Sequence, residues 1–495
     1  MSREWIEEEL ETADLGDQRL NERFAEVLKA LSERPNVSIP AACGGHAETL
    51  AAYRFFDNEK TTFEKIIRPH YKKTQERIAA YEVVLFVQDS STIDLTKPGQ
   101  QVQGAGPVGD GKNRRGAILH LLEALTPESV VLGAAWSKVM IRSEPDEQEQ
   151  LERATRTKAE KEQVRRIKLK RPIEEKESFR WVEGYRETNK IAKQHPQTTC
   201  VCIGDSESDF FEIFAEPREN NAHILVRACQ DRCCSVDEHD TSTHLRDVVS
   251  REAVVGTSEV FVRARQPAVS CARQPRQQVR KSRDAKLEIR AKTVTIPPLR
   301  RLRHQYESVP LNVVLVSEPN PPEGEPAIEW ILLTTLPIST WEEISAIIKY
   351  YSSRWMIEIF FKTLKSGCGV EKLRFETMER LLPCLAIYLI VAWRVLMICR
   401  LGRVETEMSC EIVFDPAEWK ATYRVMHPKK KLPSKPPTLN AMLRLVGELG
   451  GWVSTPGRKD MPGPQTTWIG LQRVRDLAWA WKMFGPEAEK YQKDV

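Results

Sequence analysis

Three acidic residues occupy positions where carboxylates commonly do chemistry. Asp89 comes just after the apolar run 83–87, and Asp205 comes just after the largely apolar run 199–203. Such runs are typical of central strands buried on both faces, so we expect both acids at the carboxyl ends of strands. Glu358 lies in the stretch 350–365, which has no Gly or Pro and repeats apolar residues at helical spacing.

These three carboxylates predict a metal site if their elements are neighbours. Ligands of open α/β sheets bind outside the carboxyl ends of the strands, where Asp89 and Asp205 would converge and Glu358 would join them from a helix. Convergent carboxylates repel one another unless divalent cations lie between them, and oxygen ligands favour Mg²⁺ or Mn²⁺. Two such ions about 4 Å apart catalyse phosphoryl transfer. Taken singly, each acid is more often a turn former at a strand end.

Glu358 shares its predicted helix with a phenol and several cations. At about 100° per residue, Tyr351, Arg354, Glu358, Lys362 and Lys365 fall within roughly 80° of one another. One interpretation is a solvated salt-bridge ladder, which is common for a lone Glu among cations. The other is a metal ligand flanked by groups that contact phosphates.

The elements that must position these residues change in type along the chain. The first 78 residues show helical periodicity and predict a small bundle, with helices at about 19–31, 46–56 and 62–81. Strands are predicted at 83–91, 117–125, 130–139, 199–205, 223–227, 311–317 and 329–335. Further helices are predicted at 145–195, 207–214, 350–365 and 369–401, and short strands between 229 and 309. An amphipathic tail is predicted at 439–484, interrupted at Gly450–Gly451 and at Pro456–Pro464. This order is typical of an α/β core flanked by helical regions.

Charge is concentrated in one segment. The net charge of the 495 residues is only +4, but residues 263–303 hold thirteen Lys or Arg and two acids. That block is the electrostatic signature of a polyanion partner, and a solvated loop is the alternative. Eleven cysteines without a C-x-x-C pair indicate reduced thiols rather than zinc ligands. The acidic start at 4–11 and the short apolar run at 381–393 predict neither a signal peptide nor a membrane span.

The sequence resembles the bacterial DDE transposases of the insertion-sequence-four family. The stretch from Tyr351 to Lys365 carries the family's Tyr-x2-Arg-x3-Glu-x6-Lys signature in full. Other matching segments are Leu15–Asp17, Ala52–Phe55, Asp89–Ser91, Arg115–Gly116 with His120, Lys176–Ser178 with Trp181, Asp205, Trp330, Trp355 and Leu449–Gly451. Ser90 departs from the usual Thr, and the similarity is weaker in 231–300 and 402–440.

The resemblance implies a ribonuclease-H-like catalytic core at 79–375 with a β-rich insertion at about 230–309. It also implies an N-terminal helical DNA-binding domain at 1–78 and a C-terminal helical dimerisation region at 376–495. Asp89, Asp205 and Glu358 would be the catalytic metal ligands.

The resemblance also implies contacts with DNA. Tyr351, Arg354 and Lys365 would bind phosphates near the transposon end. Trp330 and Trp355 would accommodate a flipped base, although core packing is the alternative for each. Arg227 and the block 263–303 would bind DNA as well. His120, inside an apolar strand, is better explained as a hydrogen-bonded core residue.

The activity implied is cut-and-paste transposition. A homodimer would hold terminal repeats of double-stranded DNA, cleave them through a hairpin intermediate with two Mg²⁺ (or Mn²⁺) ions, and join them to target DNA. It would act in the bacterial cytoplasm, on the nucleoid, with no membrane partner. The alternatives are a non-catalytic DNA-binding relative that inhibits transposition and a structure-specific nuclease.

Overall fold

The computed structural model describes residues 4–97, 99, 101–109, 114–144, 152, 155–236, 243–262, 281–453 and 461–488. The chain divides into two compact units. Unit 1 contains residues 1–155 and 355–495, and unit 2 contains residues 156–354. The boundary therefore falls inside the stretch 350–365 that the sequence predicts as one helix.

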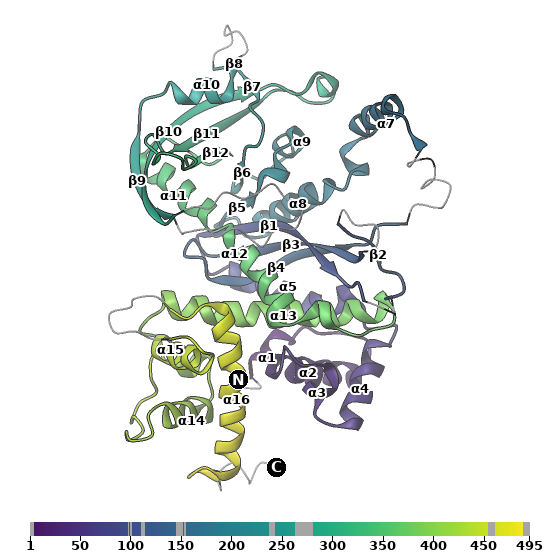
Figure 1. Ribbon diagram of the computed structural model, residues 1–495, viewed down its shortest axis with the longest axis vertical. Coiled ribbons are helices and arrows are strands. Elements are labelled where there is room, and N and C mark those ends of the chain that lie inside the picture. The colour runs from purple at the N-terminus through teal and green to yellow at the C-terminus, as the bar shows by residue number, and fades with distance from the viewer. Residues whose placement is uncertain are drawn as a thin grey trace. The chain divides into compact units, whose positions relative to one another are not determined.

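Unit 1 has helices at its beginning and end in the sequence and strands between them. Its helices are α1 (Glu4–Glu9), α2 (Gln18–Glu33), α3 (Ile39–Cys43), α4 (His46–Phe56), α5 (Phe63–Ile78), α12 (Trp355–Lys362), α13 (Met378–Val404), α14 (Pro416–Met426), α15 (Leu439–Leu449) and α16 (Pro464–Phe484) (Figure 1). Its strands are β1 (Val83–Asp94), β2 (Gly106–Pro107), β3 (Arg115–Leu125) and β4 (Val131–Met140).

The amino-terminal helices begin at side chains that cap them. Asp17 accepts a hydrogen bond from the backbone N–H of Arg19 at the start of α2, and Thr62 accepts one from Lys65 at the start of α5. The apolar side of α2, including Phe24, is fully buried. The three helices predicted before residue 82 are confirmed.

Strands β1, β3 and β4 form an antiparallel sheet in which β3 lies between the other two. Residues 84–88 of β1 are fully buried, as predicted from their apolar character. The predicted strand end at Asp89 is wrong, because β1 continues to Asp94 and Asp89 pairs with Leu121 of β3. The later part of β1 is polar and half-buried, so loss of apolar residues marks a change of exposure and not the end of pairing.

The long helix α13 is the core of unit 1. It packs against α5, β4 and α16, and its Trp393 indole donates a hydrogen bond to the carbonyl of Val131 at 3.1 Å. By length and composition alone it would suffice to cross a membrane, but 89% of its most apolar window is buried within the protein. The helix thus serves as packing surface, in line with the predicted buried helix.

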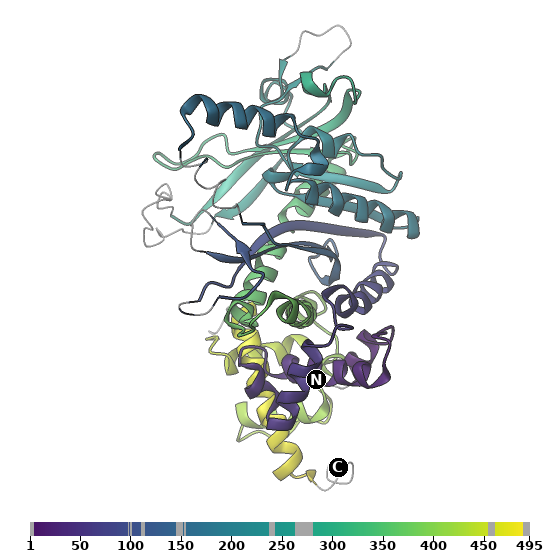
Figure 2. The same cartoon turned by 90° about the vertical axis from the view of Figure 1, so that its right-hand side faces the viewer.

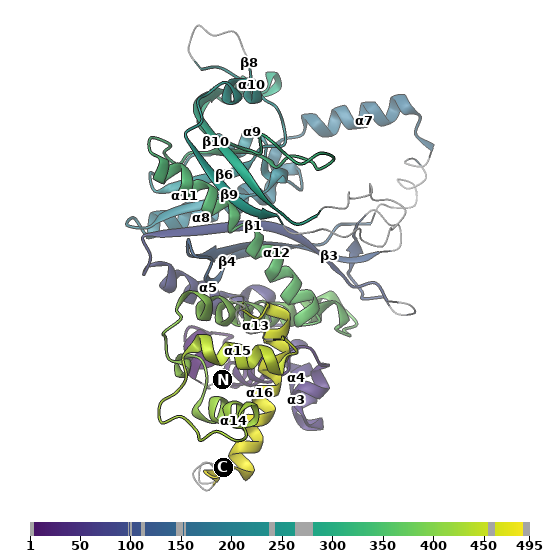
Figure 3. The ribbon, with the colours of Figure 1, turned by 60° about the vertical axis from the view of Figure 1, so that its left-hand side comes forward.

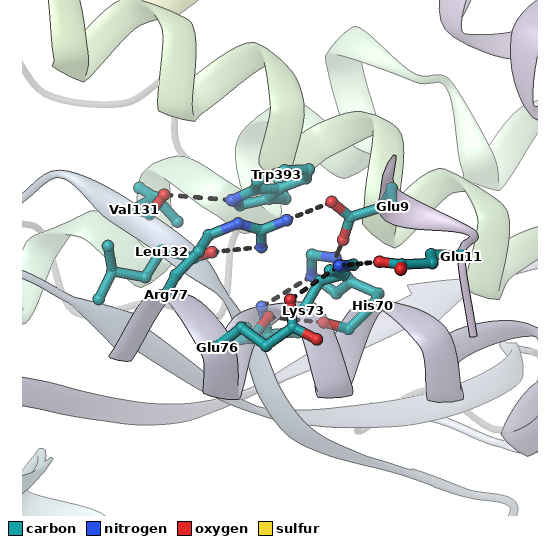
Figure 4. Close-up of polar contacts among 11 residues, drawn as sticks. Glu9, Glu11, His70, Lys73, Glu76, Arg77, Val131, Leu132 and Trp393 are labelled. Carbon is teal, nitrogen blue, oxygen red and sulfur yellow. Dashed lines mark hydrogen bonds and ion pairs between the residues drawn. The ribbon is translucent and has the colours of Figure 1, made fainter. Parts of the chain in front are cut away.

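A cluster of charged side chains holds α1 on α5 (Figure 4). Arg77 of α5 forms an ion pair with Glu9 of α1 and donates a hydrogen bond to the carbonyl of Leu132 at 2.8 Å. Its guanidinium lies 4.1 Å from the ring centroid of Trp393. The first helix, which sequence periodicity does not reveal, is therefore fixed to the core by these polar contacts together with its buried Trp5 and Ile6.

The helices after α13 share a core of their own. Buried residues of this core include Cys399, Phe414, Trp419, Met442, Val446 and Trp468. Helix α16 packs against α13, α14 and α15, and α15 begins at Thr438, whose hydroxyl accepts from the N–H of Ala441. The sequence suggests α15 and α16 but gives no sign of α14.

Unit 2 combines a sheet with helices. Its helices are α7 (Lys158–Lys170), α8 (Phe179–Gln194), α9 (Phe211–Phe214), α10 (Leu245–Ser250) and α11 (Trp341–Ser352). Its strands are β5 (Thr199–Gly204), β6 (Ala222–Arg227), β7 (Cys233–Cys234), β8 (Thr243–His244), β9 (Gly256–Val262), β10 (Arg283–Ile296), β11 (Val309–Ser317) and β12 (Glu329–Thr334) (Figure 3).

The sheet of unit 2 runs in the order β5-β6-β12-β11-β10-β9. β5 and β6 are parallel, and every later pair is antiparallel. Helix α8 packs on β5 and β6 (Figure 2). An antiparallel trio in unit 1 and a parallel pair with its helix in unit 2 are the strand types of a ribonuclease-H-like core, so the predicted fold class is confirmed.

The β-rich insertion contains a longer strand than predicted. β10 spans 14 residues and pairs with both β9 and β11. Along this strand, charged residues on the outer face alternate with buried Ala285, Leu287 and Ile289. The basic composition of the segment hides this alternation in the sequence. Residues 263–280 of the basic block lie outside the described residues.

The predicted single helix over 350–365 is also wrong. α11 ends at Ser352, and the N–H of Arg354 donates to the carbonyl of Tyr351 at 3.0 Å in a tight turn before α12 begins. The hydroxyls of Ser352 and Ser353 donate to the carbonyls of the residues four positions earlier, which competes with helical continuation. A π-helical turn at Thr363–Gly367 then follows α12.

Candidate active site

The carboxyl ends of β5 and β6 carry two of the predicted residues. Gly204 of β5 pairs with Val226 of β6, and Asp205 and Arg227 directly follow these two partners. Parallel strands place such successive residues at one edge of the sheet. Gly204 is required there because an added Cβ would lie 2.2 Å from the Ser208 hydroxyl oxygen. The strand end predicted before Asp205 is therefore confirmed.

The segment 205–209 contains three acids that could act as a metal ligand, and their contacts differ. Asp209 is buried and receives two hydrogen bonds from Arg232, at 3.0 and 2.7 Å, and two from backbone N–H groups. Glu207 is exposed and forms an ion pair with Arg180 at 3.2 Å. Asp205 uses Oδ1 to cap the following 3₁₀ turn, while Oδ2 makes no hydrogen bond with any residue that the structure describes. Asp205 is thus the acid with a ligand oxygen to offer.

Tyr351 and Arg354 belong to the same group of residues in unit 2. Tyr351 is buried at the end of α11, and the Arg354 guanidinium acts on its hydroxyl. Burial raises the pKa of Tyr351, and the nearby Asp205 adds to this effect, whereas Arg354 and Arg227 oppose it. The phenol therefore stays neutral and keeps its O–H as a donor. Unit 2 brings together Asp205, Arg227, Tyr351 and Arg354.

Two tryptophans were predicted to accommodate a base. The Trp330 ring lies 6.0 Å from that of Tyr351, with the two planes at 58°. Trp330 is half-buried, so part of its ring faces solvent. The side chain of Trp355, at the start of α12, is 59% exposed, which excludes core packing of this side chain within the chain.

Asp89 lies on β1 in unit 1 between two residues that share one partner. Gln88 Oε1 is 3.1 Å from Nε2 of His120, and the Ser90 hydroxyl is 2.8 Å from Nδ1 of the same ring. His120 is fully buried on β3, as expected of a hydrogen-bonded core histidine. Because side chains alternate along a strand, these two bonds fix the face opposite to that of Asp89.

Glu358 and Lys365 lie on the segment that follows the turn. Helix α12 packs against β1, and its Glu358 is half-buried. Lys365 lies in the π-helical turn, where Cys368 N–H bonds to the carbonyl of Thr363 at 2.8 Å. Its ammonium is 3.6 Å from Glu371, which also accepts a hydrogen bond from the N–H of Asp94 at 3.0 Å. Such π-turns are frequent at functional sites.

The fit of these residues to a divalent cation is a matter of donor chemistry. Asp89, Asp205 and Glu358 offer only carboxylate oxygens, the ligands that Mg²⁺ and Mn²⁺ prefer. Among the described residues, neither unit by itself gathers three His, Cys, Asp or Glu side chains into a metal site. Asp205 belongs to unit 2, whereas Asp89 and Glu358 belong to unit 1.

Sequence reasoning missed several partners that shape this site. Glu371 and Arg232 are charged residues without a motif, so no spacing rule distinguishes them from surface charges. The double role of His120 depends on the pairing of β1 with β3, which places it opposite Ser90. A strand alignment of 83–91 against 117–125 would have shown this contact.

Three family models match successive parts of the chain. A model described as transposase DNA-binding matches residues 2–61, one described as transposase DDE domain matches residues 181–392, and one described as transposase Tn5 dimerisation domain matches residues 390–480. Among solved structures, a piggyBac transposase synaptic complex with hairpin DNA is similar at 10% identity, with a TM-score of 0.27. That match covers 81% of this chain and 57% of the other.

Proposed function

Because this chain belongs to the Tn5-like DDE transposases, we propose that it is a cut-and-paste DNA transposase. The predicted insertion-sequence-four family is consistent with this membership. The enzyme would bind terminal repeats of double-stranded DNA, cut the DNA at the ends of the element, and join the freed 3′-hydroxyls to target DNA. The hairpin intermediate is part of this proposal.

The observation that carries the proposal is the group of four residues in unit 2. A carboxylate with one oxygen to offer, two guanidinium groups and a neutral phenol meet at the edge of a parallel strand pair. Cations and hydroxyls bind phosphate oxygens, and a carboxylate among them has no use in phosphate binding unless it holds a cation. This combination suits the handling of a phosphodiester beside a metal ion.

We assign Asp89, Asp205 and Glu358 as the catalytic residues, which together would hold two Mg²⁺ or Mn²⁺ ions. The bound ions would supply the charge stabilisation and the water activation that phosphoryl transfer requires. The protein would contribute position. The bonds from His120 to both neighbours of Asp89 would hold that carboxylate in place, and the cap that Asp205 makes would fix its rotamer.

DNA contacts are assigned to the remaining residues. Arg227, Arg354 and Lys365 would bind phosphates, and Tyr351 would donate its O–H to one of them. Exposed Trp355 and half-buried Trp330 would stack on an unpaired base, since aromatic side chains bind bases in this way.

The flanking regions would bind DNA and a second copy of the chain. Residues 1–78 would form the DNA-binding part, and residues 376–495 would form the dimerisation region. In the latter, Trp479 and Phe484 of α16 are 63% and 79% exposed, with their ring centroids 6.2 Å apart. Large exposed aromatic side chains of this kind are typical of protein interfaces. The complex would act on DNA in the bacterial cytoplasm.

A cleavage assay tests the proposal. The substrate is a DNA fragment that carries the inverted repeats flanking the gene, incubated with Mg²⁺ and the full-length protein. We expect cut ends and strand-transfer products from the wild type, and neither product from Glu358→Ala, which should still bind the repeats. Cleavage by Glu358→Ala at the wild-type rate would contradict the catalytic assignment.

The same assay separates the alternatives. A DNA-binding relative that inhibits transposition would retard the repeats in a gel without cutting them. A structure-specific nuclease would cut without paired ends and yield no joined product. A direct measurement of Mn²⁺ binding by electron paramagnetic resonance adds a readout that does not depend on activity, and Asp205→Asn should weaken that binding.

A further inference from the structure

A hollow of about 520 Å³ in unit 2 lies between two short cationic segments that the proposed active site does not use. One segment is the end of α7, residues 165–171, which holds five cations and no acid. The other is residues 300–304, with three arginines and His304. Lys170 and Arg171 line the hollow from the first segment, and Arg301 and His304 line it from the second.

Both segments are anchored and not free tails. Ile173 and Leu302, next to the cations of each segment, are buried. The N–H of Tyr306 donates to the carbonyl of Leu302 at 3.0 Å, and the Tyr306 ring lies 5.9 Å from that of Phe211. The cations are therefore presented on a fixed surface, which reduces the ordering cost of binding.

Acids neutralise only part of this charge. Buried Glu212 lies 3.5 Å from Arg301, and Glu162 lies 3.5 Å from both Arg165 and Arg166. Glu174 also lines the hollow. Five cations form no ion pair with any described residue: Lys168, Lys170, Arg171, Arg300 and Arg303.

The nearby Lys176 is affected by its own burial and by this excess of positive charge. Burial lowers the pKa of Lys176, the neighbouring Arg301 lowers it further, and Glu212 opposes the change. Lys168 and Lys170 in the last turn of α7 also stabilise the helix dipole, which explains one or two cations there. The dipole does not account for Arg171 or for the arginines of 300–303, which belong to another segment.

We propose that this hollow and its rim bind the sugar-phosphate backbone of duplex DNA without reading its sequence. The inference rests on the proposed function in that it supplies a DNA partner. It takes up the end of the basic block 263–303, whose arginines at 300–303 form one rim, and adds the end of α7 as a second rim that no earlier assignment includes. Lysine and arginine bind phosphate oxygens by charge, and contacts to the phosphate backbone carry no sequence information. The partner is therefore any duplex, including target DNA.

The test is the salt dependence of DNA affinity. The full-length variant Lys168→Ala/Lys170→Ala/Arg171→Ala should lose about tenfold or more in affinity at low salt. Its slope of log affinity against log salt should shrink by roughly 2 to 3, since each lost phosphate contact removes about 0.9. The loss should be equal for a terminal-repeat duplex and an unrelated duplex. Arg300→Ala/Arg303→Ala should act in the same direction from the other rim.

A charge-matched control is Lys190→Ala/Lys193→Ala/Lys286→Ala, which removes three exposed lysines from α8 and β10. An equal loss in the control, an unchanged salt slope, or an effect limited to one of the two segments would overturn the proposal. A loss limited to the terminal repeat would overturn sequence-independent binding.

The same measurements distinguish this inference from the proposed function. A wild type that binds unrelated duplex through these cations but never cuts would support the inference and contradict the transposase activity. If the wild type cuts and joins ends but all variants bind DNA as tightly as the wild type, the transposase activity would be supported and the inference contradicted.

Discussion

Nδ1 of His70 lies 2.5 Å from Oε1 of Glu9, and both side chains are buried (Figure 4). The other ring nitrogen, Nε2, accepts a hydrogen bond from the N–H of Ala134 at 2.9 Å. This second bond requires a lone pair on Nε2, so the imidazole is neutral and donates from Nδ1 to the carboxylate. One uncharged ring thus links α1, α5 and β4.

Acid should weaken the fold through this ring. Burial lowers the pKa of His70 below 6.5, although Glu9 opposes the shift. Below about pH 6.5 the unfolded chain binds a proton that the folded ring resists, so the stability present above this pH is lost as pH falls. The limiting slope is about 1.4 kcal/mol per pH unit. Urea denaturation at about pH 7.5 and pH 5.5 should show this loss in wild type and much less of it in His70→Gln. The control His304→Gln should keep the wild-type loss of stability. If His70→Gln lost as much stability between the two pH values as His304→Gln does, His70 would not be the cause of the acid sensitivity.

Glu123 predicts the opposite pH dependence. It is fully buried on β3, neither carboxyl oxygen has a hydrogen-bond partner among the described residues, and burial raises its pKa to about 8. The folded state keeps a proton that the unfolded chain loses above about pH 4.5, so stability falls as pH rises from about 4.5 to the folded pKa of about 8 and levels off above it. Glu123→Met should raise the free energy of unfolding by on the order of 3 kcal/mol at pH 7. The exposed control Glu128→Met should change it little, and a destabilised Glu123→Met would show that the carboxyl has a stabilising partner.

Substitutions of Asp205 and Asp209 should have different effects, one on cleavage and the other on stability. Asp209→Asn breaks the buried pair with Arg232 and should cost about 3–5 kcal/mol of unfolding free energy. Asp205→Asn keeps a capping side chain and should change stability by less than about 0.5 kcal/mol while abolishing cleavage. Differential scanning calorimetry beside the cleavage assay separates the two effects. Wild-type cleavage by Asp205→Asn would remove this residue from the catalytic set.

Glu371 should restrain Lys365 in the absence of DNA. Glu371→Gln keeps the oxygen that accepts from the N–H of Asp94 but removes the charge that faces the ammonium. Both side chains are partly exposed, so we expect a gain of only about two- to threefold in affinity for the terminal repeat at low salt. The gain should vanish in a Lys365→Ala background, as a double-mutant cycle would measure. A gain that persists there would assign the effect to general charge.

Strand patterns predicted more of the site than helix patterns did. The largely apolar run before Asp205 predicted its strand end because a short run of this kind, closed by a turn-forming residue such as Gly204, favours a buried strand. The same argument misplaced the end at Asp89, since pairing with β3 continues through polar residues. A helical wheel placed Tyr351 and Glu358 on one face, but two serine hydroxyls end α11 between them, and a wheel does not contain such side-chain bonds. The pairing of Lys365 with Glu371 was equally hidden, because a π-turn separates them.

The apolar helix α13 also governs how the protein is made. Its partners α5 and β4 precede it in the chain and are available as soon as it leaves the ribosome, whereas α16 is synthesised last. Between the end of α13 at Val404 and the end of α16 at Phe484, roughly 80 residues must still be translated, and for that time one side of this 27-residue apolar helix lacks its cover. A transcript cut short after Val404 would therefore yield a product that aggregates or requires a chaperone, and yield in expression hosts should depend on the last helix more than on the catalytic residues.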